Sequence, residues 1–218
     1  MRTNAFSKTY GNRTVLRVGP VELEPGRIHV LVGANGSGKS TFARILAGIE
    51  TADNREKPFV GDVRTGYLPQ KPYAFRMSLE RNLRIASGEP EREEELIRLL
   101  KLEPVRRTAA NRLSGGETAR MALARSLMKP CDLLILDEPS ASMDMESTIL
   151  SEEAILAYRE KTGAAILLIT HSLRQAGRMG ENLLFFREGE LRESGPCAEC
   201  LAHPKTEDLR RFLDFYGA

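Results

Sequence analysis

The chain has 218 residues, of which 41% are hydrophobic and 28% charged, and this length is enough for one domain with a substantial core. Its 32 Lys and Arg side chains nearly balance 30 Asp and Glu, so the net charge of +2 excludes nucleic-acid binding driven by bulk charge. The longest clean apolar run, residues 164–169, is far shorter than the roughly 20 residues of a membrane span. Without a signal-like N-terminal segment, and with three cysteines, the chain is predicted to be cytoplasmic with reduced thiols.

The first third of the chain is predicted to contain short strands, a glycine-rich segment and one helix. Apolar runs predict strands over residues 14–18, 20–23 and 27–32, the last continuous enough for the interior of a parallel sheet. Residues 42–47 predict a helix that ends at Gly48. Residues 51–62 are expected to form a short connection before a strand at 66–70.

The remaining elements alternate between helices and buried strands. Helical patterns fill residues 78–128, with one helix over 93–102 and a second beginning near 114. Further strands are predicted at 133–136 and 165–169, a hairpin around Glu188-Gly189, and an amphipathic helix over 203–216. This order predicts an α/β fold with a mainly parallel sheet, N-terminal antiparallel strands and a helical subdomain at about 72–128, inserted in a single domain spanning 1–218.

The glycine-rich segment after the strand at 27–32 fits the pattern G-x-x-x-x-G-K-[ST] of a phosphate-binding loop. In such a loop successive backbone N–H groups point at a polyphosphate, the following helix adds its positive end, a lysine reaches the β- and γ-phosphates and a hydroxyl binds Mg²⁺. A surface turn rich in glycine is the alternative. The residues predicted to contact nucleotide are Gly33, Ala34, Asn35, Gly36, Ser37, Gly38, Lys39, Ser40 and Thr41.

A second acidic feature follows the apolar strand at 133–136. This strand ends in Asp137 and Glu138, and a buried strand of a parallel sheet delivers such carboxylates to the edge where ligands bind. Asp137 is predicted to reach the Mg²⁺ shell, and Glu138 to polarise an attacking water. The alternative is an acidic strand end that meets the start of a helix.

The segment Leu113-Ser114-Gly115-Gly116-Glu117, together with the two features above, resembles the nucleotide-binding subunits of ABC transporters. The resemblance covers essentially the whole chain and implies the P-loop NTPase fold of the ABC type, with ATP and Mg²⁺ as cofactors. It also implies that Ser114, Gly115 and Gly116 close on ATP held by a second subunit in a head-to-tail dimer. Without the resemblance, Ser114 and Glu117 form only a capping box at a helix start.

Four further residues fall where the resemblance places functional groups. Tyr10 corresponds to the aromatic residue that stacks on adenine, Gln70 to the glutamine of the Mg²⁺ and water network, and His171 to the switch histidine. Asp144 corresponds to the aspartate of the loop between subunits. The resemblance therefore implies that Glu138, His171, Gln70 and Lys39 take part in catalysis, and that Ser40, Gln70 and Asp137 hold Mg²⁺. For Tyr10 and His171, core or structural roles are the alternatives.

Two features depart from the family or stand outside it. The segment Pro139-Ser140-Ala141-Ser142-Met143 replaces the usual Pro-Thr-Ser-Ala-Leu, but it keeps the small and apolar pattern. The region between Thr41 and Gln70 is short, so the strands usual there are expected to be trimmed. Cys197, Cys200 and His203 have the spacing of a partial zinc site, although no fourth ligand is evident nearby, and buried or idle thiols are the favoured interpretation; Gly195 and Pro196 predict a loop before the tail helix.

The predicted function is hydrolysis of ATP in an ABC transporter whose permease is a separate membrane polypeptide. The expected partners are a second ATPase subunit, this permease and a solute-binding protein, without nucleic acid, and the expected location is the inner face of the cell membrane. Importers of amino acids or of oxyanions such as tungstate and molybdate resemble the chain in its tail. The alternatives are an exporter subunit and a soluble ABC ATPase of translation or DNA repair.

Overall fold

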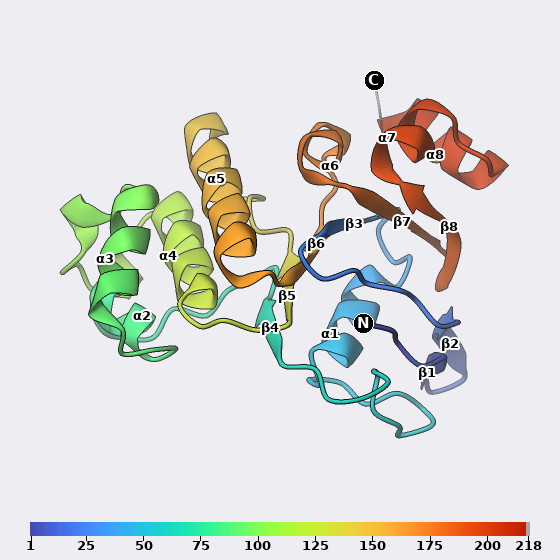
Figure 1. Cartoon of the computed structure of the whole chain (residues 1–218), viewed down its shortest axis with the longest axis horizontal. Coiled ribbons are helices and arrows are strands. Elements are labelled where there is room, and N and C mark those ends of the chain that lie inside the picture. Colours follow the sequence, from blue (N-terminus) through green and yellow to red (C-terminus); the bar gives the residue numbers. More distant parts are fainter. Residues whose placement is uncertain (217–218) are drawn as a thin grey trace.

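The computed structural model describes residues 1–216, and its centre is a six-stranded sheet (Figure 1). The strand order is β4-β5-β6-β3-β7-β8; neighbouring strands are parallel except β7 and β8, which form an antiparallel hairpin. The strands are β3 (Ile28–Val32), β4 (Thr65–Leu68), β5 (Leu133–Asp137), β6 (Ala165–Ile169), β7 (Asn182–Arg187) and β8 (Glu190–Pro196). The mainly parallel α/β sheet predicted from the sequence is confirmed.

The central strands are buried on both faces, which explains their continuous apolar runs. All five residues of β3, β5 and β6 are buried. Alternate side chains of each strand enter two separate cores: Leu134 and Leu136 face one, Leu133 and Ile135 the other. Burial of apolar surface stabilises the fold by about 25 cal/mol per Å², and these strands bury apolar surface on both faces. They therefore form a stable support for the site.

Helices cover both faces of the sheet. Their bounds are α1 (Lys39–Leu46), α2 (Leu79–Arg84), α3 (Pro90–Leu99), α4 (Gly115–Leu127), α5 (Met145–Thr162), α6 (Leu173–Met179), α7 (Cys197–Ala202) and α8 (Glu207–Tyr216), with 3₁₀ turns η1 (Glu103–Val105) and η2 (Ala110–Arg112). Helices α2, α3 and α4, which lie between β4 and β5 in the sequence, gather at one end of the molecule (Figure 1).

The N-terminal antiparallel strands predicted from the sequence are confirmed, but their positions differ from the prediction. A two-stranded antiparallel sheet pairs β1 (Phe6–Tyr10) with β2 (Arg13–Val18), and β1 was not predicted. The predicted strand at 20–23 is wrong: it makes only an isolated bridge between Glu22 and Arg2. Pro20 has no N–H to donate, and the N–H of Val21 is bound by the Thr3 hydroxyl, so no ladder extends from this segment.

Three helices, α5, α6 and α7, and the end of β8 were also missed. Helix α5 begins at the N-cap Asp144 and ends at Gly163, whose φ of +67° suits a glycine C-cap. Helix α6 begins at the N-cap Ser172. The loop predicted before the tail helix is wrong, because Gly195 and Pro196 complete β8 and Cys197 begins α7.

Candidate active site

The phosphate-binding loop lies between the carboxyl end of β3 and the start of α1. Gly33 has a φ of +150°, and a Cβ at this position would lie 2.2 Å from the carbonyl oxygen of Phe186 and 2.9 Å from Ser37 Oγ. Gly38 has a φ of +100° and is the N-cap of α1. Glycine is therefore favoured at both positions, because the backbone has a positive φ there and a side chain on residue 33 would clash with its neighbours.

Lys39 is the first residue of α1, and its side chain reaches back into this loop. Its Nζ donates to the carbonyl oxygens of Gly33 at 2.7 Å and Ala34 at 2.9 Å, and the residue is only 5% exposed. Burial lowers the pKa of the Lys39 ammonium, while the charges of Glu138 and Asp137 raise it. Because an ionised phosphate bonds an ammonium more strongly than a neutral carbonyl does, the geometry favours a polyphosphate ligand.

Asp137 provides an oxygen-rich position beside the loop. It is 2% exposed, its Oδ2 accepts from the Tyr67 hydroxyl at 3.3 Å, and its Oδ1 is buried without a hydrogen-bond partner among the described residues. Ser40, Gln70 and Asp137 line the same cavity. An orphaned carboxylate oxygen beside a hydroxyl and an amide is the hard donor set that Mg²⁺ prefers, so the residues fit this ion.

Burial also shifts the pKa values of Asp137 and Tyr67. It raises the pKa of the Asp137 carboxyl, helped by the charge of Glu138 and opposed by the Ser40 hydroxyl. It raises the pKa of Tyr67 to about 12, together with the charge of Asp137. Without a bound cation, an ionised Asp137 is therefore costly to the fold.

We expect Asp137→Asn to stabilise the nucleotide-free chain at pH 7 by about 0.5–2 kcal/mol while abolishing Mg²⁺-dependent hydrolysis. The folded-state pKa of Asp137 lies above its unfolded value, so the penalty is absent below the unfolded pKa. It grows as pH rises through the folded pKa and is fully present above it. Urea unfolding of both proteins from pH 3 to 8, without Mg²⁺, measures this. A difference in stability that does not change with pH would contradict the assignment.

Glu138 directly follows β5 and contacts one residue after each of the two neighbouring strands, β4 and β6. Gln70 Nε2, two residues after β4, donates to Glu138 Oε2 at 2.9 Å, and His171 Nε2, two residues after β6, contacts Oε1. The carboxyl ends of the parallel strands thus bring together the three predicted residues. Glu138 has a φ of +54°, a strained backbone conformation of the kind that persists at functional sites.

One cavity of about 520 Å³ joins most of the predicted nucleotide residues. Its lining consists of Tyr10, Arg13, Val15, residues 35–41, Gln70, Glu138 and His171. Tyr10 lies at the end of β1 with 47% of its surface exposed, its hydroxyl bonded to Glu50 and Lys8 Nζ 5.3 Å from its ring centre. Arg13 and Val15 were not predicted; recognition of the β1–β2 hairpin would have placed Arg13 opposite Tyr10 and Val15 two residues further along β2.

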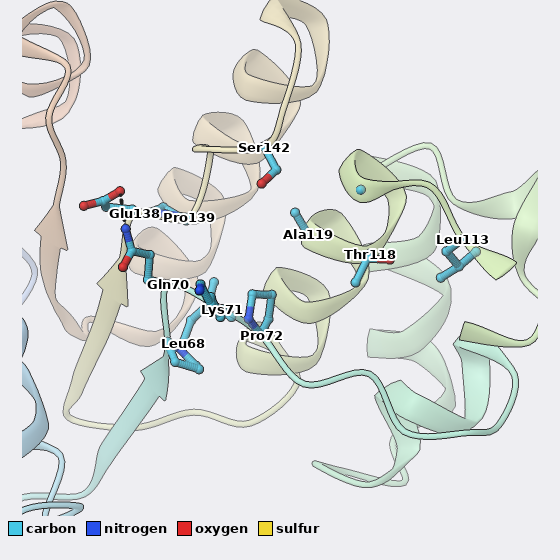
Figure 2. Close-up of a pocket in the computed structure, with 12 residues that line it drawn as sticks. Leu68, Gln70, Lys71, Pro72, Leu113, Thr118, Ala119, Glu138, Pro139 and Ser142 are labelled. Atoms are coloured by element: carbon cyan, nitrogen blue, oxygen red, sulfur yellow. Dashed lines mark hydrogen bonds between the residues drawn. The ribbon is translucent and has the colours of Figure 1, made fainter. Parts of the chain in front are cut away.

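Ser114, Gly115 and Gly116 lie elsewhere, at the start of α4. The capping box is present: Ser114 Oγ accepts from the N–H of Glu117 at 3.3 Å, and the Glu117 side chain accepts from the N–H of Ser114 at 2.8 Å. None of these residues lines the cavity of the phosphate-binding loop. They are separated from it by a second cavity, of about 330 Å³, that Gln70, Glu138 and the start of α4 border (Figure 2).

Asp144 is also outside the nucleotide cavity. Its Oδ1 accepts from the N–H of Ser147 at 2.7 Å and caps α5, and this hydrogen bond lowers the pKa of the Asp144 carboxyl. The structure thus shows a helix cap, and the nucleotide role of Asp144 stays a prediction.

The two cysteines of the possible zinc site lie in the hydrophobic core. Cys197 and Cys200 are buried, Cys197 Sγ lies 3.4 Å from the carbonyl oxygen of Ala176, and burial raises the pKa of Cys197 to about 11. His203 is exposed. Within residues 1–216 no three His, Cys, Asp or Glu side chains are placed to hold a metal ion.

A parallel sheet, a phosphate-binding loop at one strand end and carboxylates at the next define the class of P-loop nucleoside triphosphatases. Among solved structures, an ATP-binding subunit of an ABC transporter superposes with a TM-score of 0.82 at 20% identity, covering 100% of this chain and 99% of the other. RNase-L Inhibitor superposes with a TM-score of 0.81 at 27% identity, covering 99% of this chain and 42% of the other.

The family model described as ABC transporter matches residues 20–141. The tungstate uptake system ATP-binding protein TupC of Peptoclostridium acidaminophilum is 36% identical over 205 residues, which cover 87% of this chain and 95% of that protein. The Fe(3+) ions import ATP-binding protein FbpC 2 of Pectobacterium atrosepticum is 30% identical, covering 98% of this chain and 67% of that protein. The chain belongs to the ABC transporter ATP-binding family and is an ATPase.

Proposed function

We propose that this ATPase energises the import of a small solute through a separate membrane permease. The observation that carries its chemistry is the placement of Glu138 at the rim of the phosphate-binding cavity, held by Gln70 and His171. Import is supported by the two relatives named for tungstate uptake and Fe(3+) import. We infer an oxyanion of the tungstate or molybdate type, or an amino acid, as the solute.

Each residue of the cavity has a distinct part in the proposed reaction. The loop amides and Lys39 bind the phosphates, and the Tyr10 ring stacks on adenine. Glu138 accepts a proton from the attacking water, while Gln70 and His171 fix the direction of its carboxylate. Ser40, Asp137 and Gln70 hold Mg²⁺, which when bound neutralises charge that develops on the phosphoryl oxygens.

We further propose that two copies act as a head-to-tail dimer. Ser114, Gly115 and Gly116 open a helix, where N–H groups and the helix dipole favour an anion, yet they lie outside this chain's own nucleotide cavity. In the dimer each set, with Asp144 nearby, closes on ATP held by the other copy. The single domain of residues 1–218, with its helical subdomain at about 72–128, then presents both surfaces to the partner.

The permease is proposed to contact residues 72–82, directly after Gln70. Tyr73 is 64% exposed, and its ring packs edge-on against Phe75. No helix of residues 1–216 is long and apolar enough to span a membrane. We propose that the chain is held at the inner face of the cell membrane by this contact, beside a permease served by a solute-binding protein.

A pull-down from detergent-solubilised native membranes tests the proposal, with the Glu138→Gln chain as bait because slowed hydrolysis prolongs the ATP-bound state. We expect a multi-spanning protein, and its sequence would separate import from export. Recovery of only ribosomal or DNA-repair proteins would contradict the transporter proposal and favour the soluble alternative.

The contact surface is tested in the same experiment. Replacing Tyr73 and Phe75 with Ser is expected to abolish recovery of the membrane protein and to leave ATP hydrolysis by the isolated chain within about twofold. The matched control replaces Val60 and Phe215, which are 63% and 78% exposed elsewhere on the surface, with Ser. Equal recovery with both double variants would contradict the proposed contact.

A further inference from the structure

Arg120 lies on α4, one turn after the capping box, and links this helix to the start of α5. Its Nη1 donates to the hydroxyl of Ser147 in the first turn of α5. A Cβ on Gly116 would lie 3.6 Å from the same nitrogen and 3.8 Å from the carbonyl oxygen of Ser142. The guanidinium therefore lies where the start of α4, the loop of residues 140–144 and the start of α5 meet.

The charge of Arg120 also acts on an acidic residue at the start of each helix, Asp144 for α5 and Glu117 for α4. Ser147, which Arg120 bonds, also donates its N–H to Asp144 Oδ1 at 2.7 Å. The pKa of Asp144 is lowered mainly by this hydrogen bond and further by the charge of Arg120. The pKa of Glu117 is lowered by hydrogen bonds from Ser114 and again by Arg120. One cation thus acts on both helix caps.

Stability alone does not explain an arginine at this position. Its Nε is buried and has no hydrogen-bond partner among the described residues, and Ser147 is 5% exposed. A buried donor without a partner costs free energy, and an apolar side chain of similar volume would avoid that cost. Such groups call for an explanation, and they gather where function constrains the side chain.

We propose that Arg120 is a positioning residue that holds the 140–144 loop against the turn of residues 113–117. The inference rests on the proposed head-to-tail dimer, in which both segments face the second copy. With Arg120 in place the two segments present one rigid surface, so closure onto the partner's nucleotide loses little conformational entropy. The phosphate-binding loop of the same chain is not part of this contact.

Three variants test the proposal: Arg120→Met, Arg120→Lys and Ser147→Ala. ATP-dependent dimerisation is measured by light scattering in the Glu138→Gln background, and kcat with Glu138 present. Binding of a fluorescent ATP analogue is measured at concentrations where the chain is monomeric. A hydrogen bond to a charged group corresponds to a factor of about 10 to 100. We expect Arg120→Met to weaken dimerisation and lower kcat by about this factor, with monomer affinity for nucleotide within about twofold.

The other variants separate positioning from a general structural role. Arg120→Lys is expected to recover part of the dimerisation, because an ammonium can still donate to Ser147. Ser147→Ala is expected to weaken dimerisation as much as Arg120→Met does, and the variant with both substitutions is expected to be no weaker than either alone. The control is Arg125→Met on the same helix, whose guanidinium bonds Asn82 and the carbonyl oxygen of Tyr73 instead; it is expected to leave dimerisation unchanged.

Two results would overturn the inference. One is normal dimerisation and kcat in Arg120→Met; the other is a parallel loss of thermal stability, monomer nucleotide binding and activity that lysine does not rescue. A Glu138→Gln chain that fails to dimerise with ATP would instead contradict the proposed dimer, and the inference with it. A dimer that forms equally well with Arg120→Met contradicts the inference and leaves the proposed dimer standing.

Discussion

Replacing Glu138 with glutamine is expected to lower kcat for ATP hydrolysis by about 10² to 10⁴, the usual contribution of a general base. Glutamine keeps the shape of the side chain and can still meet Gln70 and His171, but it cannot accept the proton of water. Lys39 is held by loop carbonyls and not by Glu138, so the substitution leaves the phosphate-binding lysine in place and we expect ATP binding to survive. Phosphate release and calorimetric titration with ATP measure the two effects.

The matched control for this substitution is Glu188→Gln. Glu188 lies in the β7–β8 hairpin, is also a glutamate at positive φ (+53°), and lines none of the cavities described above. Any effect of glutamine on this backbone conformation would appear there as well. We expect the control to hydrolyse ATP at the normal rate. A Glu138→Gln chain that keeps more than about a tenth of its activity would rule out Glu138 as the base.

The second large effect is expected from Gly33→Ala, through the fold of the phosphate-binding loop. The added Cβ would lie 2.2 Å from a backbone oxygen of Phe186, on the neighbouring strand β7, at a φ of +150° that alanine rarely adopts. Neither atom can rotate away, so β3 or β7 must shift. We expect a loss of about 3 kcal/mol or more in the free energy of unfolding, measured with urea.

Gly36→Ala separates the clash from the backbone strain. Gly36 has a φ of +77°, but a Cβ there meets nothing within 4 Å. Only the cost of a left-handed alanine remains, about 1 kcal/mol. Equal losses of stability in the two variants would show that the contact with Phe186 does not constrain the loop.

The sequence predicted those elements best whose burial is nearly complete. Strands β3, β5 and β6 have five buried residues each, so their apolar runs are unbroken. Helix α5 was missed because its buried positions include polar residues: Ser151 and Glu152 are buried beside Ala154 and Ile155. Glu152 is tolerated there because it bonds Gln175 and Arg178, from a helix that the sequence also did not reveal.

Local sequence by itself determined the phosphate-binding loop, the acidic end of β5 and the capping box of α4. Each depends on neighbours within a few residues, through turn conformation, helix dipole and side-chain reach. The grouping of Gln70 and His171 on Glu138 follows from the strand order β4-β5-β6, which joins residues 68 apart in the first case. Likewise, only the tertiary structure joins Arg120 to Ser147. Such contacts depend on which strands and helices pack together, and long-range packing is not encoded in any short segment.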